Sequence, residues 1–248
     1  TATAWYHQRL SQDLQADLHA TLDTVESFAL GEYTSALMQG DALPDDDRQE
    51  IVNKLARYTG LTPAYVEQTH MRIEIHRFVK ELLRDQKRTV GRLDSRFTGI
   101  DRDAAGENFD FDPSMAAITG PYTATLNDYV RSELEFESDL PYEILTSRVQ
   151  PWGYDKQQNQ YVNVGETLRE AMTKNPFLKV IVANGFFDLA TPYFATRYTF
   201  NHLGLDPALQ ENLSMTYYEA GHMMYIQLES LAQLKQDLAE FLRATLPT

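Results

Sequence analysis

The sequence contains no cysteine, which excludes disulfide bonds and thiolate metal sites. Basic residues are also scarce, because 22 lysines and arginines stand against 36 aspartates and glutamates and leave a formal net charge of −14. Such a surplus of negative charge argues against binding to nucleic acid or to anionic membrane surfaces. No apolar run approaches the roughly 20 residues of a membrane span. We therefore expect a globular chain, with 248 residues available for one large domain or two small ones.

Two short apolar runs near the carboxyl end dominate the pattern. Residues 178–183 predict a strand that turns at Asn184-Gly185 and is followed by Asp188. Residues 214–218 predict a second strand, which is followed by His222. Because a helical pattern lies between the runs, we expect the two strands to be parallel neighbours. Asp188 and His222 would then lie together, just beyond the carboxyl ends of both strands.

An aspartate and a histidine so placed suit acyl-transfer chemistry. The imidazole of His222 could take a proton from a nucleophile, provided that it is neutral and correctly oriented. The carboxylate of Asp188, on the other ring nitrogen, would fix the tautomer and stabilise the imidazolium that forms. Gly221 would let the backbone turn sharply before the histidine. The alternative at this point is an aspartate that caps a strand and an ordinary core histidine.

These segments resemble the serine carboxypeptidases. Asn184-Gly-Phe-Phe-Asp-Leu-Ala-Thr-Pro192 is similar to the aspartate segment of that family, and Ala220-Gly-His-Met223 to its histidine segment. Arg88-Thr-Val-Gly-Arg-Leu-Asp-Ser-Arg-Phe97 and Leu140-Pro-Tyr-Glu143 extend the resemblance to the bacterial branch of the family. The resemblance implies an α/β-hydrolase fold, a peptide substrate, and a periplasmic or secreted location.

The nucleophile of that family is not found in the sequence. Its serine lies in a Gly-x-Ser-x-Gly elbow between a strand and a helix, upstream of the aspartate. Eight serines precede Asp188, none of them flanked by glycines at that spacing, and no glycine-rich oxyanion loop is present. We therefore interpret the chain as the carboxyl-terminal portion of a hydrolase, carrying Asp188 and His222 but not the serine. The serine would come from the upstream portion of the enzyme or from a partner chain. The isolated chain would be inactive, and it would self-associate or need the amino-terminal portion of the enzyme.

The predicted elements divide the chain at about residue 140. Residues 1–140 are predicted as a mostly helical cap or insertion, and residues 141–248 as the carboxyl-terminal part of the catalytic domain. The helical patterns cover 1–40, the stretch from Pro44 to Gly60, a short helix capped by Thr62, a longer helix through Leu82 and Leu83, and residues 122–137. A weak strand is predicted over 89–97, a helix over 163–174, and a last helix with a capping box at Ser230 and Gln233 and a buried stripe of leucines.

Three further sets of residues bear on ligands. Met223, next to the histidine, is the predicted wall of the substrate leaving-group pocket, with ordinary packing as the alternative. Asp101, Asp103, Gly106 and Asp112 only partly fit a calcium loop, so we favour a solvated acidic loop and expect neither metal nor other cofactor. Arg84, Lys87, Arg88, Arg92 and Arg96 could recognise a substrate carboxylate, but we favour pairing with the acids of the chain itself.

The leading interpretation is thus a serine carboxypeptidase-like hydrolase that acts on peptides. One alternative keeps the fold but makes the enzyme an esterase or aminopeptidase with a helical cap. Another, from a different class, is a binding module that has lost its nucleophile. A serine elbow upstream would separate the hydrolases from the binding module, whereas only recognition of the substrate carboxylate separates the carboxypeptidase from the esterase or aminopeptidase.

Overall fold

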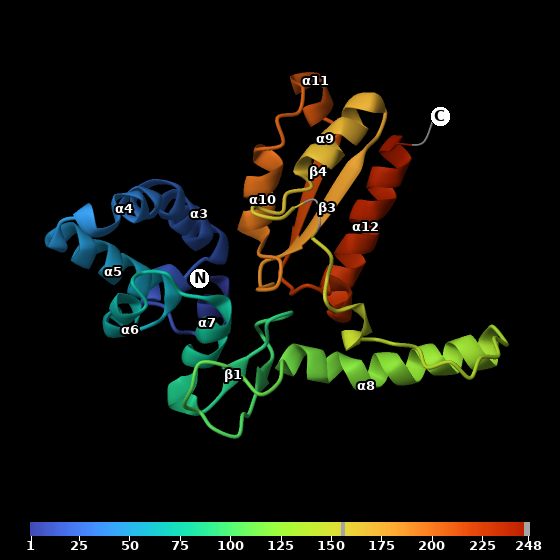
Figure 1. Cartoon of the computed structure of the whole chain (residues 1–248), viewed down its shortest axis with the longest axis horizontal. Helices are drawn as coiled ribbons and strands as arrows, with labels where there is room; N and C mark the ends of the chain where they lie inside the picture. The colour runs from blue at the N-terminus through green and yellow to red at the C-terminus, as the bar shows by residue number, and fades with distance from the viewer. Residues whose placement is uncertain (155–156, 246–248) are drawn as a thin grey trace.

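The computed structural model describes residues 1–154 and 157–245. Its first part is an assembly of seven short α-helices (Figure 1). A π-helical turn, η1 (Ala29–Tyr33), joins α3 to α4, and two 3₁₀ turns, η2 (Gly40–Ala42) and η3 (Arg84–Gln86), follow α4 and α7. The α-helices are α1 (Ala2–Tyr6), α2 (Gln12–Gln15), α3 (Leu18–Phe28), α4 (Thr34–Gln39), α5 (Asp45–Thr59), α6 (Pro63–Gln68) and α7 (Ile75–Glu81).

Local signals in the sequence set several of these helix ends. Gly40 and Gly60 follow α4 and α5 with φ of +57° and +73°, a region that favours glycine. The Thr62 side chain accepts the N–H of Tyr65 at 3.2 Å and caps α6, as predicted. Two predictions were wrong. Residues 1–40 form four α-helices and not one, and α7 ends at Glu81, before the buried Leu82.

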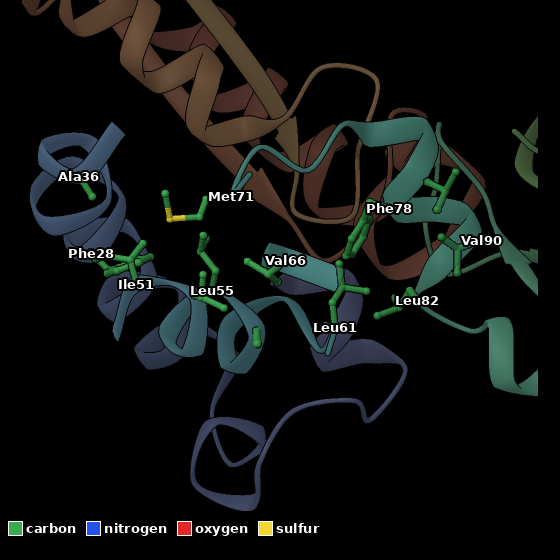
Figure 2. Close-up of a cluster of buried hydrophobic side chains, with 14 of the residues drawn as sticks. Phe28, Ala36, Ile51, Leu55, Leu61, Val66, Met71, Phe78, Leu82 and Val90 are labelled. Atoms are coloured by element: carbon green, nitrogen blue, oxygen red, sulfur yellow. The ribbon is translucent and has the colours of Figure 1, made fainter. Parts of the chain in front are cut away.

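A buried apolar cluster holds these helices together (Figure 2). Phe28 from α3, Leu55 from α5 and Val66 from α6 belong to it, and Phe78 of α7 and Val90 of the segment after α7 extend it. Fully burying side chains of this kind stabilises a fold by roughly 1.5–3 kcal/mol each. The helical part therefore has a core of its own.

The middle of the chain is irregular. β1 (Thr89–Val90) pairs antiparallel with β2 (Thr98–Gly99), so the strand predicted over 89–97 is limited to its first two residues. The next helix, α8 (Pro113–Asp128), starts well before the predicted residue 122. It begins there because the Asp112 carboxylate accepts the Ser114 N–H at 2.9 Å and proline suits the first helical position. α8 continues into the π-helical η4 (Tyr129–Glu133) and projects from the body of the molecule (Figure 1).

The last part of the chain contains a parallel sheet. β3 (Val180–Gly185) pairs in parallel with β4 (Leu213–Tyr218), which confirms the predicted arrangement. The predicted turn at Asn184-Gly185 was wrong, because both residues continue the strand and pair with Tyr217 and Tyr218. The remaining elements are η5 (Ser147–Val149), α9 (Gly165–Lys174), α10 (Tyr193–Asn201), α11 (Pro207–Gln210), η6 (Met224–Ile226) and α12 (Leu228–Thr245).

The sheet runs between α9 and α12 (Figure 1). Met172 of α9 is fully buried in a cluster that includes Val180 of β3. α12 differs from its prediction in two respects. α12 starts at Leu228, so Ser230 lies inside the helix and does not cap it. The predicted capping box at Ser230 and Gln233 was therefore wrong. The predicted stripe is only partly buried, since Leu231 and Leu238 are each 40% exposed.

Helices and strands alternate along residues 165–245, which places the protein in the α/β class. No helix within residues 1–154 and 157–245 is long and apolar enough to cross a lipid bilayer. The division of the chain at residue 140 stays a prediction.

Candidate active site

Asp188 and His222 lie together at the carboxyl ends of the two parallel strands. The Nδ1 atom of His222 is 2.8 Å from Oδ2 of Asp188, although 34 residues separate them in the sequence. β3 carries the aspartate and β4 the histidine, and the register of the strands brings the two loops to one edge of the sheet. The sequence therefore predicted both the pair and the way in which the fold brings it together.

The Asp188 carboxylate is buried and fully hydrogen-bonded. Oδ1 accepts the N–H groups of Ala190 and Thr191 at 2.7 and 3.0 Å, and Oδ2 accepts the Thr191 hydroxyl at 2.7 Å. The side chain is 5% exposed, against 44% for that of His222. A buried carboxylate fixed by its own loop is a rigid acceptor for an imidazole N–H. The sequence analysis missed Thr191, whose hydroxyl also lies 3.2 Å from Nδ1 of His222.

This contact assigns the two nitrogens of the imidazole to different roles. Nδ1 faces an anion, so it carries the proton when the ring is neutral. Nε2 is then the basic nitrogen, on a side chain that is nearly half exposed. A ring held in this tautomer can accept a proton from an approaching hydroxyl and return it later.

Close backbone packing fixes the ends of both strands. A Cβ atom on Gly185 would lie 2.2 Å from the carbonyl oxygen of Gly221, so the end of β3 directly touches the loop after β4. The Phe186 N–H donates to the Tyr218 carbonyl at 3.0 Å and the Phe187 N–H to the Ala220 carbonyl at 3.0 Å. These contacts extend the pairing of the sheet to within one residue of Asp188.

An apolar hollow of about 210 Å³ lies beside the histidine. Met223 lines it, together with Ile118 and Tyr122 of α8 and with Tyr142 and Tyr225. The sequence predicted that Met223 lines a pocket at the site, but it gave no sign that α8 also lines this hollow. The hollow is wide enough for one apolar side chain of a ligand.

Two serines whose partners include residues that contact the site are occupied by structural hydrogen bonds. The Ser95 hydroxyl donates to the Phe187 carbonyl at 2.9 Å and contacts the hydroxyl of Thr3 at 2.6 Å. The Ser114 hydroxyl donates to the Asp112 carboxylate at 2.5 Å and accepts the Leu93 N–H at 3.1 Å. Neither hydroxyl is hydrogen-bonded to His222 in the part of the chain that the structure describes.

The acidic and basic clusters have partners within the chain. Lys80 forms an ion pair with Asp101, both 3% exposed, and Asp112 caps α8. Arg84 pairs with Glu81 and Arg96 with Asp94, as favoured from the sequence for the basic cluster, whereas Lys87, Arg88 and Arg92 form no ion pair with the described residues. Across residues 1–154 and 157–245, no group of three or more histidines, aspartates and glutamates is placed to hold a metal ion.

No protein-family model, curated protein or solved structure matches the chain.

Proposed function

We propose that this chain supplies the aspartate and histidine of a serine-type, carboxypeptidase-like hydrolase with an α/β-hydrolase fold. The observation that carries the proposal is the 2.8 Å contact between Asp188 Oδ2 and His222 Nδ1 at the carboxyl ends of adjacent parallel strands. In such hydrolases the acid and the histidine follow the nucleophile along the chain, in that order. The resemblance of segments 184–192 and 220–223 to serine carboxypeptidases supports the same assignment.

In the proposed reaction a serine hydroxyl attacks the carbonyl carbon of the last peptide bond of the substrate. His222 accepts the hydroxyl proton on Nε2 and returns it to the nitrogen of the departing amino acid. Water then attacks the acyl-enzyme while His222 takes one of its protons, and His222 returns that proton to the serine oxygen as the acyl–oxygen bond breaks and the acid leaves. Asp188 keeps the ring oriented and stabilises the imidazolium.

The serine and the oxyanion hole are proposed to come from residues outside this chain, either upstream in the same enzyme or in a partner. Ser95 and Ser114 are occupied elsewhere, as described above. The hollow lined by Met223 is the proposed site of the leaving-group side chain, which its apolar wall suits.

Two measurements test the proposal. The complete enzyme should release the carboxyl-terminal amino acid from an N-blocked dipeptide, and His222→Ala should lower kcat by several orders of magnitude. His202→Ala is the matched control, because His202 is exposed and its Nδ1 contacts only the Tyr198 carbonyl of its own helix. Turnover of esters or free-amino peptides in preference to the N-blocked dipeptide would identify the capped esterase or aminopeptidase instead.

A fluorophosphonate probe reports on the nucleophile. The complete enzyme should be labelled at one serine, whereas this chain alone should remain unlabelled at all ten of its serines. Stoichiometric labelling of this chain would contradict the external nucleophile. Absence of labelling and of hydrolysis in the complete protein would favour the binding module.

A further inference from the structure

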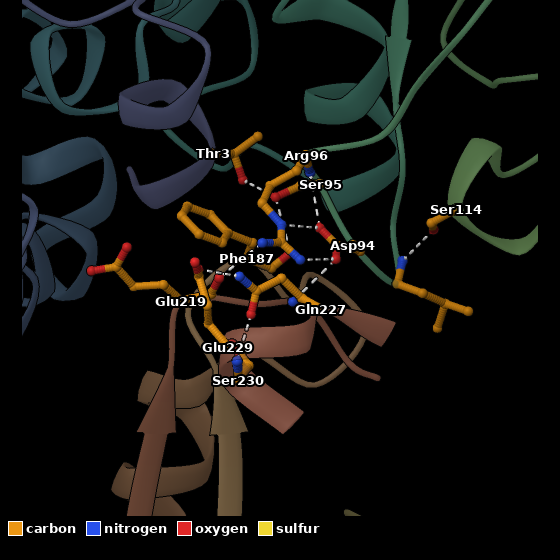
Figure 3. Close-up of polar contacts among 12 residues, drawn as sticks. Thr3, Asp94, Ser95, Arg96, Ser114, Phe187, Glu219, Gln227, Glu229 and Ser230 are labelled. Carbon is orange, nitrogen blue, oxygen red and sulfur yellow. Dashed lines mark hydrogen bonds and ion pairs between the residues drawn. The ribbon is translucent and has the colours of Figure 1, made fainter. Parts of the chain in front are cut away.

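The segment 91–97 lies against the ends of both strands of the parallel sheet (Figure 3). At the histidine loop, the Leu93 carbonyl accepts the His222 N–H at 2.7 Å, and the Asp94 carboxylate accepts the Gly221 N–H at 3.2 Å. The N–H groups of Gly221 and His222 are thus held by two adjacent residues from a segment more than 120 positions upstream.

The same segment also holds the aspartate loop. The Arg92 carbonyl accepts the Leu189 N–H at 3.0 Å, and the Ser95 N–H donates to the Phe187 carbonyl at 2.9 Å. Phe187 and Leu189 are the two neighbours of Asp188. Four consecutive residues, 92–95, therefore bind the loops of both candidate catalytic side chains.

Asp94 is the charged centre of this contact. It is 2% exposed. Arg96 donates two hydrogen bonds to its carboxylate, from Nε to Oδ1 at 2.9 Å and from Nη2 to Oδ2 at 2.7 Å. The Nη1 atom of Arg96 also donates to the carbonyl of Glu219 at 2.8 Å, on the histidine loop (Figure 3). A buried, bidentate pair of this kind has a fixed geometry, and loss of one partner leaves an uncompensated charge.

The histidine loop lies in direct contact with Asp94. A Cβ atom on Gly221 would be 2.4 Å from the Cβ of Asp94 and 2.6 Å from its Cα. Atoms cannot approach that closely, so Asp94 occupies the space that any side chain at position 221 would need. The position of Asp94 therefore sets the position of the peptide that carries His222.

We infer that Asp94, held by Arg96, is a positioning residue for His222. The inference rests on the proposed function and extends it, because it assigns the catalytic orientation of the ring to a side chain outside the aspartate and histidine segments. The His222 side chain is nearly half exposed, so its own packing restrains it little. Anchoring its backbone is then the means by which Nδ1 is kept on Asp188, and a 1 Å displacement costs about 10²-fold in rate.

The experiment compares Asp94→Ala, Asp94→Asn and the control Asp85→Ala, whose carboxylate forms an exposed pair with Arg9. In the complete enzyme, Asp94→Ala should lower kcat about 10²-fold with little change in KM. Asp94→Asn should lose less, since its amide oxygen can still accept the Gly221 N–H although it no longer neutralises Arg96. Asp85→Ala should retain the kcat of the parent enzyme.

A second readout needs no substrate. In the ¹H NMR spectrum of ¹⁵N-histidine-labelled chain, the proton between His222 Nδ1 and Asp188 should give a far-downfield resonance that His222→Gln removes. Asp94→Ala should weaken or abolish this resonance while the chain remains folded by circular dichroism, and Asp85→Ala should leave it unchanged. If Asp94→Ala does not fold, Asp94→Asn decides the question, with a weakened resonance expected.

Two results would overturn the inference. One is a folded Asp94 variant that keeps both the parent kcat and the parent resonance. The other is a variant with reduced kcat but an unchanged resonance, because Asp94 would then act on another part of the site. Failure of the proposed function is seen separately, as a parent protein without hydrolysis, and the resonance still tests the positioning in that case.

Discussion

Ser95 and Phe187 are 92 residues apart in the sequence and are joined by two hydrogen bonds, since the N–H and the hydroxyl of Ser95 both donate to the Phe187 carbonyl at 2.9 Å. Ser95 is fully buried and Phe187 is 2% exposed. The contact connects the irregular segment 91–97 to Phe187, the residue that precedes Asp188. The aspartate loop thus depends on the irregular segment 91–97 for its geometry.

Asp188→Asn should lower kcat of the complete enzyme about 10⁴-fold while leaving the fold intact, because an amide favours the wrong tautomer of the His222 ring. Steady-state hydrolysis of an N-blocked dipeptide measures the effect. Asp85→Asn, at an exposed carboxylate, provides the control and should be unaffected. Near-native turnover of Asp188→Asn would remove Asp188 from the catalytic machinery.

Met223→Ala should alter substrate preference more than catalytic rate. The side chain lines the apolar hollow beside His222, so its truncation removes contacts to a large leaving-group side chain. We expect kcat/KM to fall about tenfold for substrates that end in leucine or phenylalanine, and to change little for those that end in glycine. An equal loss for both substrates would show that Met223 supports the loop and does not contact the leaving group.

The pair of strands, and the aspartate and histidine that follow them, were predictable because the signals are local. Residues 178–183 and 214–218 are apolar runs that fix the strands, and chain order alone then brings Asp188 and His222 to the same edge. The caps at Gly40, Gly60 and Thr62 were predictable for the same reason, since each acts within one turn of its helix.

What the sequence did not predict depends on contacts between distant segments. Asp94 and Arg96 are charged residues that local pattern places at the surface, yet they lie against the segment that follows β4, where they contact Gly221 and Glu219. The segment 91–97 was predicted as part of a strand. Its backbone instead forms hydrogen bonds with the loops after β3 and β4, and not with a neighbouring strand. Likewise, helical periodicity predicts that one face of α12 is apolar, but not whether another element covers that face.

Lys80→Met should be one of the most destabilising single substitutions in the helical part. Lys80 and Asp101 form an ion pair in which both side chains are 3% exposed. Burial works to raise the pKa of Asp101, but its hydrogen bonds with Lys80 and Thr89 outweigh burial, so the pKa is lowered. Removing the lysine leaves that carboxylate buried and unpaired, at a cost of about 3–5 kcal/mol.

Urea unfolding measures this cost. The double variant Lys80→Met with Asp101→Asn should recover part of the lost free energy of unfolding, because the amide carries no charge. Lys54→Met is the control, since Lys54 pairs with Glu32 and Glu50 on the exposed surface. A loss for Lys80→Met no larger than that of Lys54→Met would contradict the prediction.

His7 should make the fold less stable in weak acid. Its Nε2 lies 2.7 Å from the Ser95 carbonyl, and burial lowers its pKa below the usual 6.5, although that hydrogen bond opposes the shift. The unfolded chain therefore binds a proton more readily than the folded chain as the pH falls through 6.5. The contribution of His7 to stability is complete above that pH and declines below it.

His7→Gln keeps a donor for the Ser95 carbonyl but does not titrate. Thermal unfolding between pH 7.5 and pH 5 should show a smaller decline in Tm for His7→Gln than for the parent chain. His76→Gln, at an exposed histidine, should decline as the parent does. Parallel declines for His7→Gln and the parent would show that the ring of His7 is protonated as easily in the folded chain as in the unfolded one.

The isolated chain should self-associate through its parallel sheet and α12. Within the described residues β3 pairs with β4 alone, so each strand has a free edge, and such edges favour pairing with another chain. Leu238 and Leu242 of α12 are 40% and 53% exposed and extend the apolar surface.

Sedimentation velocity should therefore reveal dimers or larger species at micromolar concentration. Leu238→Lys with Leu242→Lys should shift them toward monomer, whereas Met38→Lys, at a more exposed apolar side chain on α4, should not. A parent chain that stays monomeric at these concentrations would show that neither the strand edges nor α12 mediates self-association.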